Sequence, residues 1–109
     1  MTDFKEISDC PITRTLSFIG GRWKTIILYI IADRTFRFGE ISARIPAISR
    51  KVLTEQLKEL VKDGILNRQK FNETPPRVEY SVTEFGKSLK DVLSEMEKWG
   101  FELEKHTLK

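Results

Sequence analysis

The chain has 109 residues, of which 39% are hydrophobic and 32% charged, and its formal net charge at pH 7 is +3. This length suits one compact domain, and this composition excludes a chain that is disordered throughout. The mild positive charge permits a nucleic-acid partner without demonstrating one. The most apolar run, residues 26–32, is far too short to cross a membrane, and no signal peptide is recognisable. With a single cysteine there is no internal disulfide, and we expect a cytoplasmic protein.

The first third of the chain predicts two helices after a loosely ordered arm at residues 1–9. The first helix opens at Cys10 and Pro11, because proline is tolerated in the first helical turn. It ends at the pair Gly20-Gly21. Three apolar residues at helical spacing predict one buried face for it: Ile12, Leu16 and Ile19. The second helix, about residues 22–32, is apolar nearly all round and should lie in the core.

The middle of the chain predicts a helix-turn-helix unit. A short extended piece at residues 35–38 is followed by a short helix over 39–45 and a turn at 46–48. Ser49 is a good N-cap for a longer helix, and Gly64 stands where a C-terminal glycine is expected. The longer helix carries its apolar residues on one face: Leu53, Leu57, Leu60 and Val61.

Two strands and a long helix complete the predicted order. Residues 66–72 and 77–82 predict strands, joined by a hairpin loop at 73–76 that two prolines stiffen. Thr83 should cap a last helix that reaches about His106. Its apolar residues follow steps of four and three, as in a coiled-coil seam: Phe85, Leu89, Val92, Met96, Trp99 and Leu103.

This order predicts an α+β fold, mostly α, with one winged helix-turn-helix domain over residues 1–109. The C-terminal helix, together with the N-terminal one, should form a dimer interface, because its heptad-like spacing favours a partner helix. Packing on its own domain is the alternative. The expected interface residues are Leu89, Val92, Met96, Trp99 and Leu103.

The second helix of a helix-turn-helix unit places its N-terminal turns in the major groove of DNA, where arginine and lysine can donate to guanine. The hairpin that follows it forms a wing, and an arginine there suits the minor groove. The predicted DNA contacts are Ser49, Arg50, Lys51, Thr54 and Lys58 on this helix, Arg44 on the helix before it, and Lys70 and Arg77 on the wing. The alternative is that these charges form an ordinary solvated face of a module that binds another protein.

Seven motifs in this order resemble the HxlR-type family of winged helix-turn-helix regulators, from Cys10 to Gly100. They are Cys10-Pro11-Ile12 with Ile19–Lys24, Phe36–Ile41, Ile48–Thr54, Leu57–Leu60, Asp63–Ile65, Pro75–Ser81 and Thr83–Gly86. The resemblance implies a cytoplasmic homodimer that represses or activates genes from a pseudo-palindromic DNA site. Members respond to electrophiles, oxidants or small metabolites, so a small-molecule effector is a possible partner.

Cys10 is a candidate redox sensor. It stands at a predicted helix N-terminus, where the helix dipole and Arg14 favour the reactive thiolate. The resemblance also implies this role, since thiol-sensing members carry their sensor cysteine at the matching position. The alternative is a small residue that fills space beside the N-terminal arm.

Catalytic and metal-binding patterns are missing from the sequence. His106 is the only histidine and lies near the end of the chain, so neither a nucleophile–base arrangement nor a zinc site is recognisable. We therefore expect no enzyme, no cofactor and no metal. Trp23 and Trp99 are expected to anchor the core and the interface, and an effector pocket is expected between the first two helices and the last.

Overall fold

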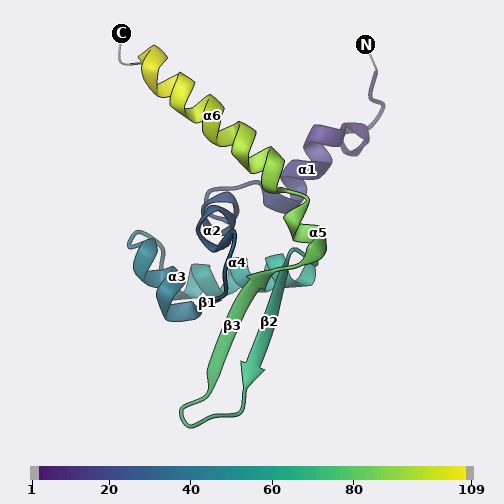
Figure 1. Ribbon diagram of the computed structural model, residues 1–109. Coiled ribbons are helices and arrows are strands. Elements are labelled where there is room, and N and C mark those ends of the chain that lie inside the picture. Colours follow the sequence, from purple (N-terminus) through teal and green to yellow (C-terminus); the bar gives the residue numbers. More distant parts are fainter. Residues whose placement is uncertain (1–2, 108–109) are drawn as a thin grey trace.

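The computed structural model describes residues 3–107 and contains a group of helices and a small antiparallel sheet (Figure 1). The three strands lie in the order β1-β3-β2, and the β2–β3 pair runs from Leu66 opposite Val82 to Phe71 opposite Arg77. From the N-terminus the elements are η1 Ile7–Asp9, α1 Pro11–Ile19, α2 Lys24–Ile31, β1 Phe36–Arg37, α3 Phe38–Arg44, α4 Arg50–Lys62, β2 Leu66–Phe71, β3 Arg77–Val82, α5 Glu84–Lys87 and α6 Lys90–Thr107.

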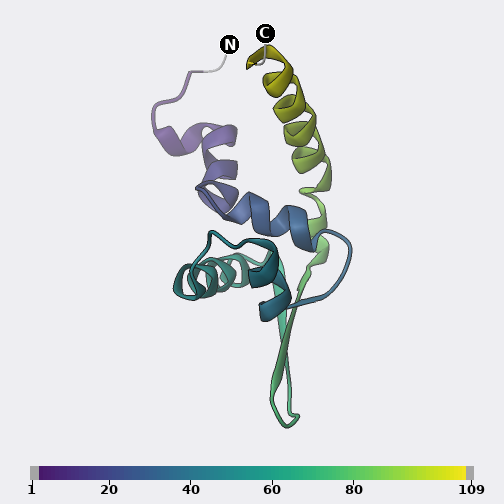
Figure 2. The same ribbon diagram turned by 90° about the vertical axis from the view of Figure 1, so that its left-hand side faces the viewer.

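The molecule is elongated, with different elements at its two ends. Helices α1 and α6 rise from one side of the body, and the β2–β3 hairpin extends from the opposite side (Figures 1 and 2). Helices α2, α3 and α4 lie between them. The fold therefore separates a hairpin end from a helical end.

The hydrophobic core lies between α2, α3, α4 and the base of the sheet. Its buried side chains include Ile27, Ile31, Ile41, Leu53, Leu57, Leu60, Ile65 and Leu66. One charged side chain is buried with them: Lys24 is 9% exposed, and its Nζ lies 3.6 Å from Oε1 of Glu59. This ion pair joins α2 to α4, so it helps to hold the orientation of α4.

Local signals at both ends of α4 match the sequence predictions. The Ser49 hydroxyl accepts a hydrogen bond from the backbone N–H of Val52 at 3.1 Å, as an N-cap residue does. Ile48 before the cap and Leu53 after it are both buried. Gly64 has φ +76°, a conformation that favours glycine, directly after the helix.

The predicted single helix from Thr83 to about His106 is interrupted. Thr83 does cap a helix, accepting from the Gly86 N–H at 2.8 Å, but that helix is only α5, and α6 begins at Lys90. The Thr83 hydroxyl also donates to the carbonyl of Gly64 at 2.6 Å. The backbone of Gly86 lies so close to the carbonyl of Ile65 that a β-carbon would collide with it. These contacts pin α5 to the end of α4, and α6 leaves in a new direction.

Three other expectations on the N-terminal side need correction. Residues 7–9 form the short 3-10 helix η1 and not a loose arm. The face of α1 expected to be buried is covered only at Ile19, since Ile12 is 70% and Leu16 52% exposed. Helix α2 begins at Lys24, and Tyr29 on it is exposed, so α2 is not buried all round.

Candidate nucleic-acid interface

Helices α3 and α4 form the predicted helix-turn-helix unit, joined by a turn at residues 45–49. The inner face of α4 is closed by the buried leucines of the core. The predicted contact residues lie on its outer face and are all exposed: Ser49, Arg50, Lys51, Thr54 and Lys58. The structure thus brings together on one surface the residues that the sequence assigned to it.

Two of these side chains already have partners within the unit. The guanidinium carbon of Arg50 lies 4.8 Å from the centre of the Phe38 ring, so the first turn of α4 is tied to the start of α3. The Thr54 hydroxyl donates to the backbone carbonyl of Arg50 at 2.8 Å. Thr54 can therefore contact DNA through its methyl group or as an acceptor, and not as a donor.

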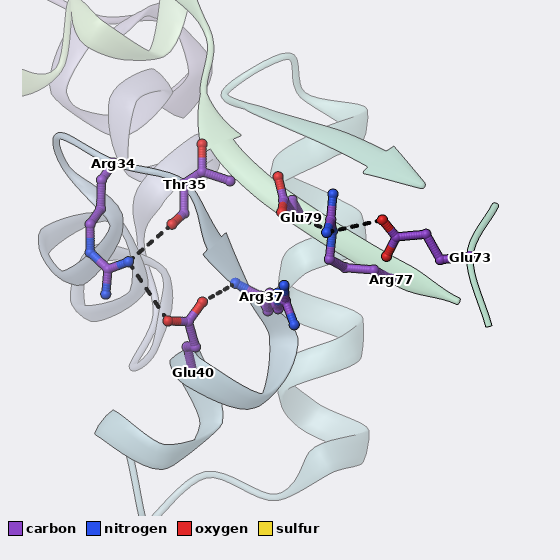
Figure 3. Close-up of polar contacts among 7 residues, drawn as sticks. All are labelled: Arg34, Thr35, Arg37, Glu40, Glu73, Arg77 and Glu79. Atoms are coloured by element: carbon purple, nitrogen blue, oxygen red, sulfur yellow. Dashed lines mark hydrogen bonds and ion pairs between the residues drawn. The ribbon is translucent and has the colours of Figure 1, made fainter. Parts of the chain in front are cut away.

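A second group of arginines surrounds β1 and the start of α3 (Figure 3). The guanidinium carbons of Arg34 and Arg44 lie 3.8 and 5.1 Å from the centre of the Phe36 ring. Glu40 accepts from the backbone N–H of Arg37 at 2.9 Å, and its carboxylate lies 3.7 Å from Arg34. That backbone hydrogen bond, with help from the nearby arginines, lowers the pKa of Glu40.

Arg34 and Arg37 were not among the predicted contacts. Both are exposed, and they add positive charge beside Arg44 at the start of the helix-turn-helix unit. Arg34 directly precedes the short extended piece that leads into α3, and Arg37 lies within it, so their position next to the predicted unit was the available signal. Arg37 is the more available of the two, since an ion pair with Glu40 already engages Arg34.

The two predicted contacts on the wing, Lys70 and Arg77, have different surroundings. Lys70 is exposed on β2, opposite Val78. Arg77 on β3 is only 25% exposed in its side chain and lies 3.1 Å from Glu73 and 3.0 Å from Glu79 (Figure 3). Its guanidinium also stacks on Phe71, 4.0 Å from the ring centre. The charge of Arg77 is thus offset within the hairpin.

The lysines among the predicted DNA contacts differ from Arg77 because, in the described part of the chain, no carboxylate offsets their charge. Within residues 3–107, Lys51, Lys58 and Lys70 form no ion pair with a carboxylate. Each of these ammonium groups can therefore meet a phosphate or a base without first leaving an acidic partner. Helix α4 and the adjoining strand β2 present all three.

The helical end of the molecule exposes several large apolar side chains. Trp99 is 66% exposed, and with Val92, Met96 and Leu103 it forms a stripe on α6 that we call the α6 seam. Leu89 was predicted to belong to the same interface, but it is half-buried against the core, in the turn between α5 and α6. Trp23, in contrast, packs against the core as expected.

Cys10 is the N-cap residue of α1, at the helical end and far from the wing. Hydrogen bonds from the backbone and side chain of Thr13, with smaller contributions from Ile12 and Arg14, lower the pKa of its thiol. The side chain is partly accessible. Both features suit a thiolate that reacts with electrophiles.

Other kinds of site find no support in the part of the chain that the structure covers. None of its helices is long and apolar enough to span a membrane. Between residues 3 and 107, the acidic, cysteine and histidine side chains also form no cluster suited to a metal ion.

A helix-turn-helix unit with an exposed basic second helix, followed by a β-hairpin, defines a winged helix-turn-helix protein. Residues 18–107 match the family described as HxlR-like helix-turn-helix. The match spans most of the chain, so the chain belongs to this family, and the resemblance noted in its sequence is confirmed.

Relatives with this fold are regulators of transcription. The chain is 44% identical over 95 residues to the HTH-type transcriptional regulator YdeP of Bacillus subtilis, covering 87% of this chain and 74% of that protein. It is 45% identical over 91 residues to the regulator YybR of the same organism, covering 84% and 73%. The protein is a transcriptional regulator of the HxlR-like family.

Solved structures agree with this fold. The redox regulator HypR matches in its oxidised form with a TM-score of 0.81 at 44% identity, over 85% of this chain and 96% of that one. The reduced form of the regulator YodB from B. subtilis matches with a TM-score of 0.72 at 43% identity, over 83% and 89%. The predicted α+β, mostly helical winged fold is confirmed.

Proposed function

We propose that this regulator acts as a homodimer that binds a pseudo-palindromic operator in the cytoplasm and catalyses no reaction. The observation that carries this proposal is the outer face of α4. Its N-terminal turns present Ser49, Arg50 and Lys51 on an exposed surface, while its leucines hold the opposite face in the core. A helix presented in this way fits the major groove.

The contacts divide between base edges and the phosphate backbone. Arg50, Lys51 and Thr54 on α4 read bases, and Lys58 further along the helix meets a phosphate. Arg44, joined by the exposed Arg37 at the start of α3, contacts the backbone. The wing reaches the adjacent groove through Lys70, while Arg77 shapes the hairpin, because two carboxylates already offset its charge.

Dimerisation places two such surfaces on one duplex. The α6 seam and the exposed residues Ile12 and Leu16 of α1 form an apolar surface at the helical end, away from the wing. Pairing of these surfaces about a twofold axis leaves both wings free. Two recognition helices then meet successive major grooves, about 34 Å apart.

Cys10 is the proposed sensor of this regulator. Its thiol is partly accessible, its pKa is lowered by Thr13, and it lies on the helical end where dimerisation is proposed. The matched structures include the redox regulator HypR in its oxidised form and a diamide-treated form of YodB from B. subtilis. Oxidation or alkylation of Cys10 would alter the dimer and, through it, DNA affinity.

The test is fluorescence anisotropy of the purified protein on labelled DNA from upstream of its own and neighbouring genes, with random duplex as competitor. We expect tight binding that weakens steeply with salt. Replacement of Lys51 by alanine should cost about 1–3 kcal/mol of binding free energy. The matched control is Lys98→Ala on α6, which should bind as the wild type does. Equal, weak binding of the wild type to specific and random DNA would contradict the proposal and favour a protein partner.

A further inference from the structure

A cavity of about 800 Å³ lies between α2, the end of β3, α5 and α6. Helix α1 contributes none of the residues that line it, so the cavity differs in place from the pocket expected between the first two helices and the last. Its size falls within the range of about 300–1,000 Å³ that is typical of small-molecule sites. The cavity is therefore large enough for an organic ligand.

The lining combines apolar side chains with a few charged ones, as ligand sites do. Its apolar part consists of Leu28, Ala32, Val82, Leu89 and Leu93. Tyr29 on α2 and Glu97 on α6 both line it, and the Glu97 carboxylate, as a hydrogen-bond acceptor and as a negative charge, raises the pKa of Tyr29. The two side chains therefore approach each other from α2 and α6.

Charges around the cavity favour an anion at α5 and the first turn of α6, where Lys87 and Lys90 lie. The charged lining residues are Asp33, Arg34, Lys87, Lys90 and Glu97, three cations and two carboxylates. Lys87 is paired with Glu84, but Lys90 has no ion pair within residues 3–107. Asp33 lies on the α2 side, and Glu97, which keeps its negative charge, lies about two turns further along α6 than Lys90. An anionic group would therefore be held near Lys90.

A partner subunit on the α6 seam would leave this cavity open. The residues of α6 that line the cavity are Lys90, Leu93, Ser94 and Glu97. With 3.6 residues per turn, the centre of this set lies roughly 140° around the helix from the centre of the α6 seam. The two surfaces thus lie on nearly opposite faces of one helix, and one can bind a ligand while the other binds a second copy.

We propose that this cavity binds a small amphipathic organic anion, with an apolar body against Leu28 and Leu93 and a carboxylate or sulfonate near Lys90. Helix α2 packs against α3 and α4, and α6 carries the seam. A ligand between α2 and α6 therefore sets the angle between the DNA-binding unit and the dimer helix. This effector role rests on the proposed function, but the binding itself does not.

The test is isothermal titration calorimetry, which measures the heat of binding when 2-naphthoate is added to the protein. The analogue of opposite charge, 2-naphthylmethylamine, is titrated in the same way. We expect 2-naphthoate to bind and the amine to bind at least about tenfold more weakly. Ser94→Trp places an indole in the cavity from an exposed helix position and should weaken 2-naphthoate binding at least about tenfold. Lys90→Gln, which removes one solvent-exposed charge, should weaken it about threefold. Lys98→Gln, a lysine of α6 outside the cavity, is the matched control and should change nothing.

Several results would overturn the proposal. Binding that survives both Ser94→Trp and Lys90→Gln would place the ligand elsewhere, and tighter binding of the amine would reverse the ligand class. No heat from either probe at millimolar concentration would refute a ligand site. Because no DNA is present, failure here with intact operator binding refutes only the cavity, whereas ligand binding without operator recognition refutes only the proposed function.

Discussion

A basic side chain is more available to DNA when no carboxylate of its own chain holds it. Lys51 and Arg77 were equivalent in the sequence, each a cation on an element that reaches DNA. In the structure Lys51 has no acidic partner within residues 3–107, whereas Arg77 lies between Glu73 and Glu79. The two residues therefore have different expected roles.

We predict that Arg77→Ala loosens the wing. The change removes two ion pairs and the stacking on Phe71, together about 1 kcal/mol in this partly exposed hairpin. Hydrogen–deuterium exchange of the β2 and β3 amides should accelerate. Lys70→Ala is the matched change, which should lower operator affinity and leave exchange in the hairpin as it was. Loss of affinity in Arg77→Ala without faster exchange would show that Arg77 contacts DNA directly.

We predict that Cys10 reacts as a thiolate at lower pH than a free cysteine does. Hydrogen bonds from Thr13 stabilise the charged form, so the pKa of Cys10 is lowered in the folded protein and the thiolate persists as the pH falls. The rate of alkylation by iodoacetamide against pH measures this. Thr13→Ala, which removes the side-chain bond, should move the midpoint upward.

Thr15→Ala is the control for Cys10, because the Thr15 hydroxyl donates within the same helix, to the carbonyl of Pro11. It should leave the alkylation midpoint where the wild type has it. A wild-type midpoint equal to that of an unfolded cysteine peptide would contradict the sensor role.

At the level of elements, sequence signals succeeded where the cause is local. Ser49 caps α4 through a hydrogen bond to a residue three positions away, and Gly64 ends it through its own backbone angle. Both depend on neighbours along the chain, so the sequence shows them directly. The exposed outer face of α4 followed in the same way from the spacing of its leucines.

The break between α5 and α6 has a distant cause. Thr83 bonds to the carbonyl of Gly64, and Gly86 packs on the carbonyl of Ile65, contacts that span about twenty residues of sequence. The heptad-like spacing of apolar residues runs through the break unaltered, so periodicity alone predicts one helix. The same applies to Leu89, which the break turns from the expected seam toward the core.

The candidate site shows the same division between what was predicted and what was not. The exposure of Lys51 and Lys70 could be predicted from the spacing of apolar residues along the helix and the strand that carry them. The pairing of Arg77 with Glu73 depends on the path of the hairpin loop, which composition does not specify. Arg37 was missed because its exposure follows from the way β1 leads into α3.

Considered as a whole, the molecule has its predicted DNA contacts on α3, α4 and the wing, and many of its large exposed apolar side chains at the other end, on α1 and α6. The charged residues of α5 and α6 are largely paired with one another, as Lys87 is with Glu84, Lys98 with Glu95 and Lys105 with Glu102. So many large exposed apolar side chains at one end are unusual in a monomer. A second copy that covers it would leave the DNA-binding end free.

We predict that Trp99→Glu dissociates the dimer. A charge at the most exposed residue of the α6 seam should cost about 2 kcal/mol or more of association free energy. Sedimentation velocity across a concentration series measures the effect. Lys98→Glu, the adjacent residue off the seam, introduces the same side chain and should sediment as the wild type does. A wild-type protein that sediments as a single monomer would contradict the dimer itself.

The two tryptophans also give the protein separate optical reporters, because the chain contains no others. Trp23 is half-buried against the core, and Trp99 is 66% exposed on the outer helix. Indole emission shifts to shorter wavelength when water is excluded from the ring. In variants that keep one tryptophan each, Trp23→Phe and Trp99→Phe, emission from Trp99 should report association in the proposed dimer on dilution, and emission from Trp23 should report unfolding of the core.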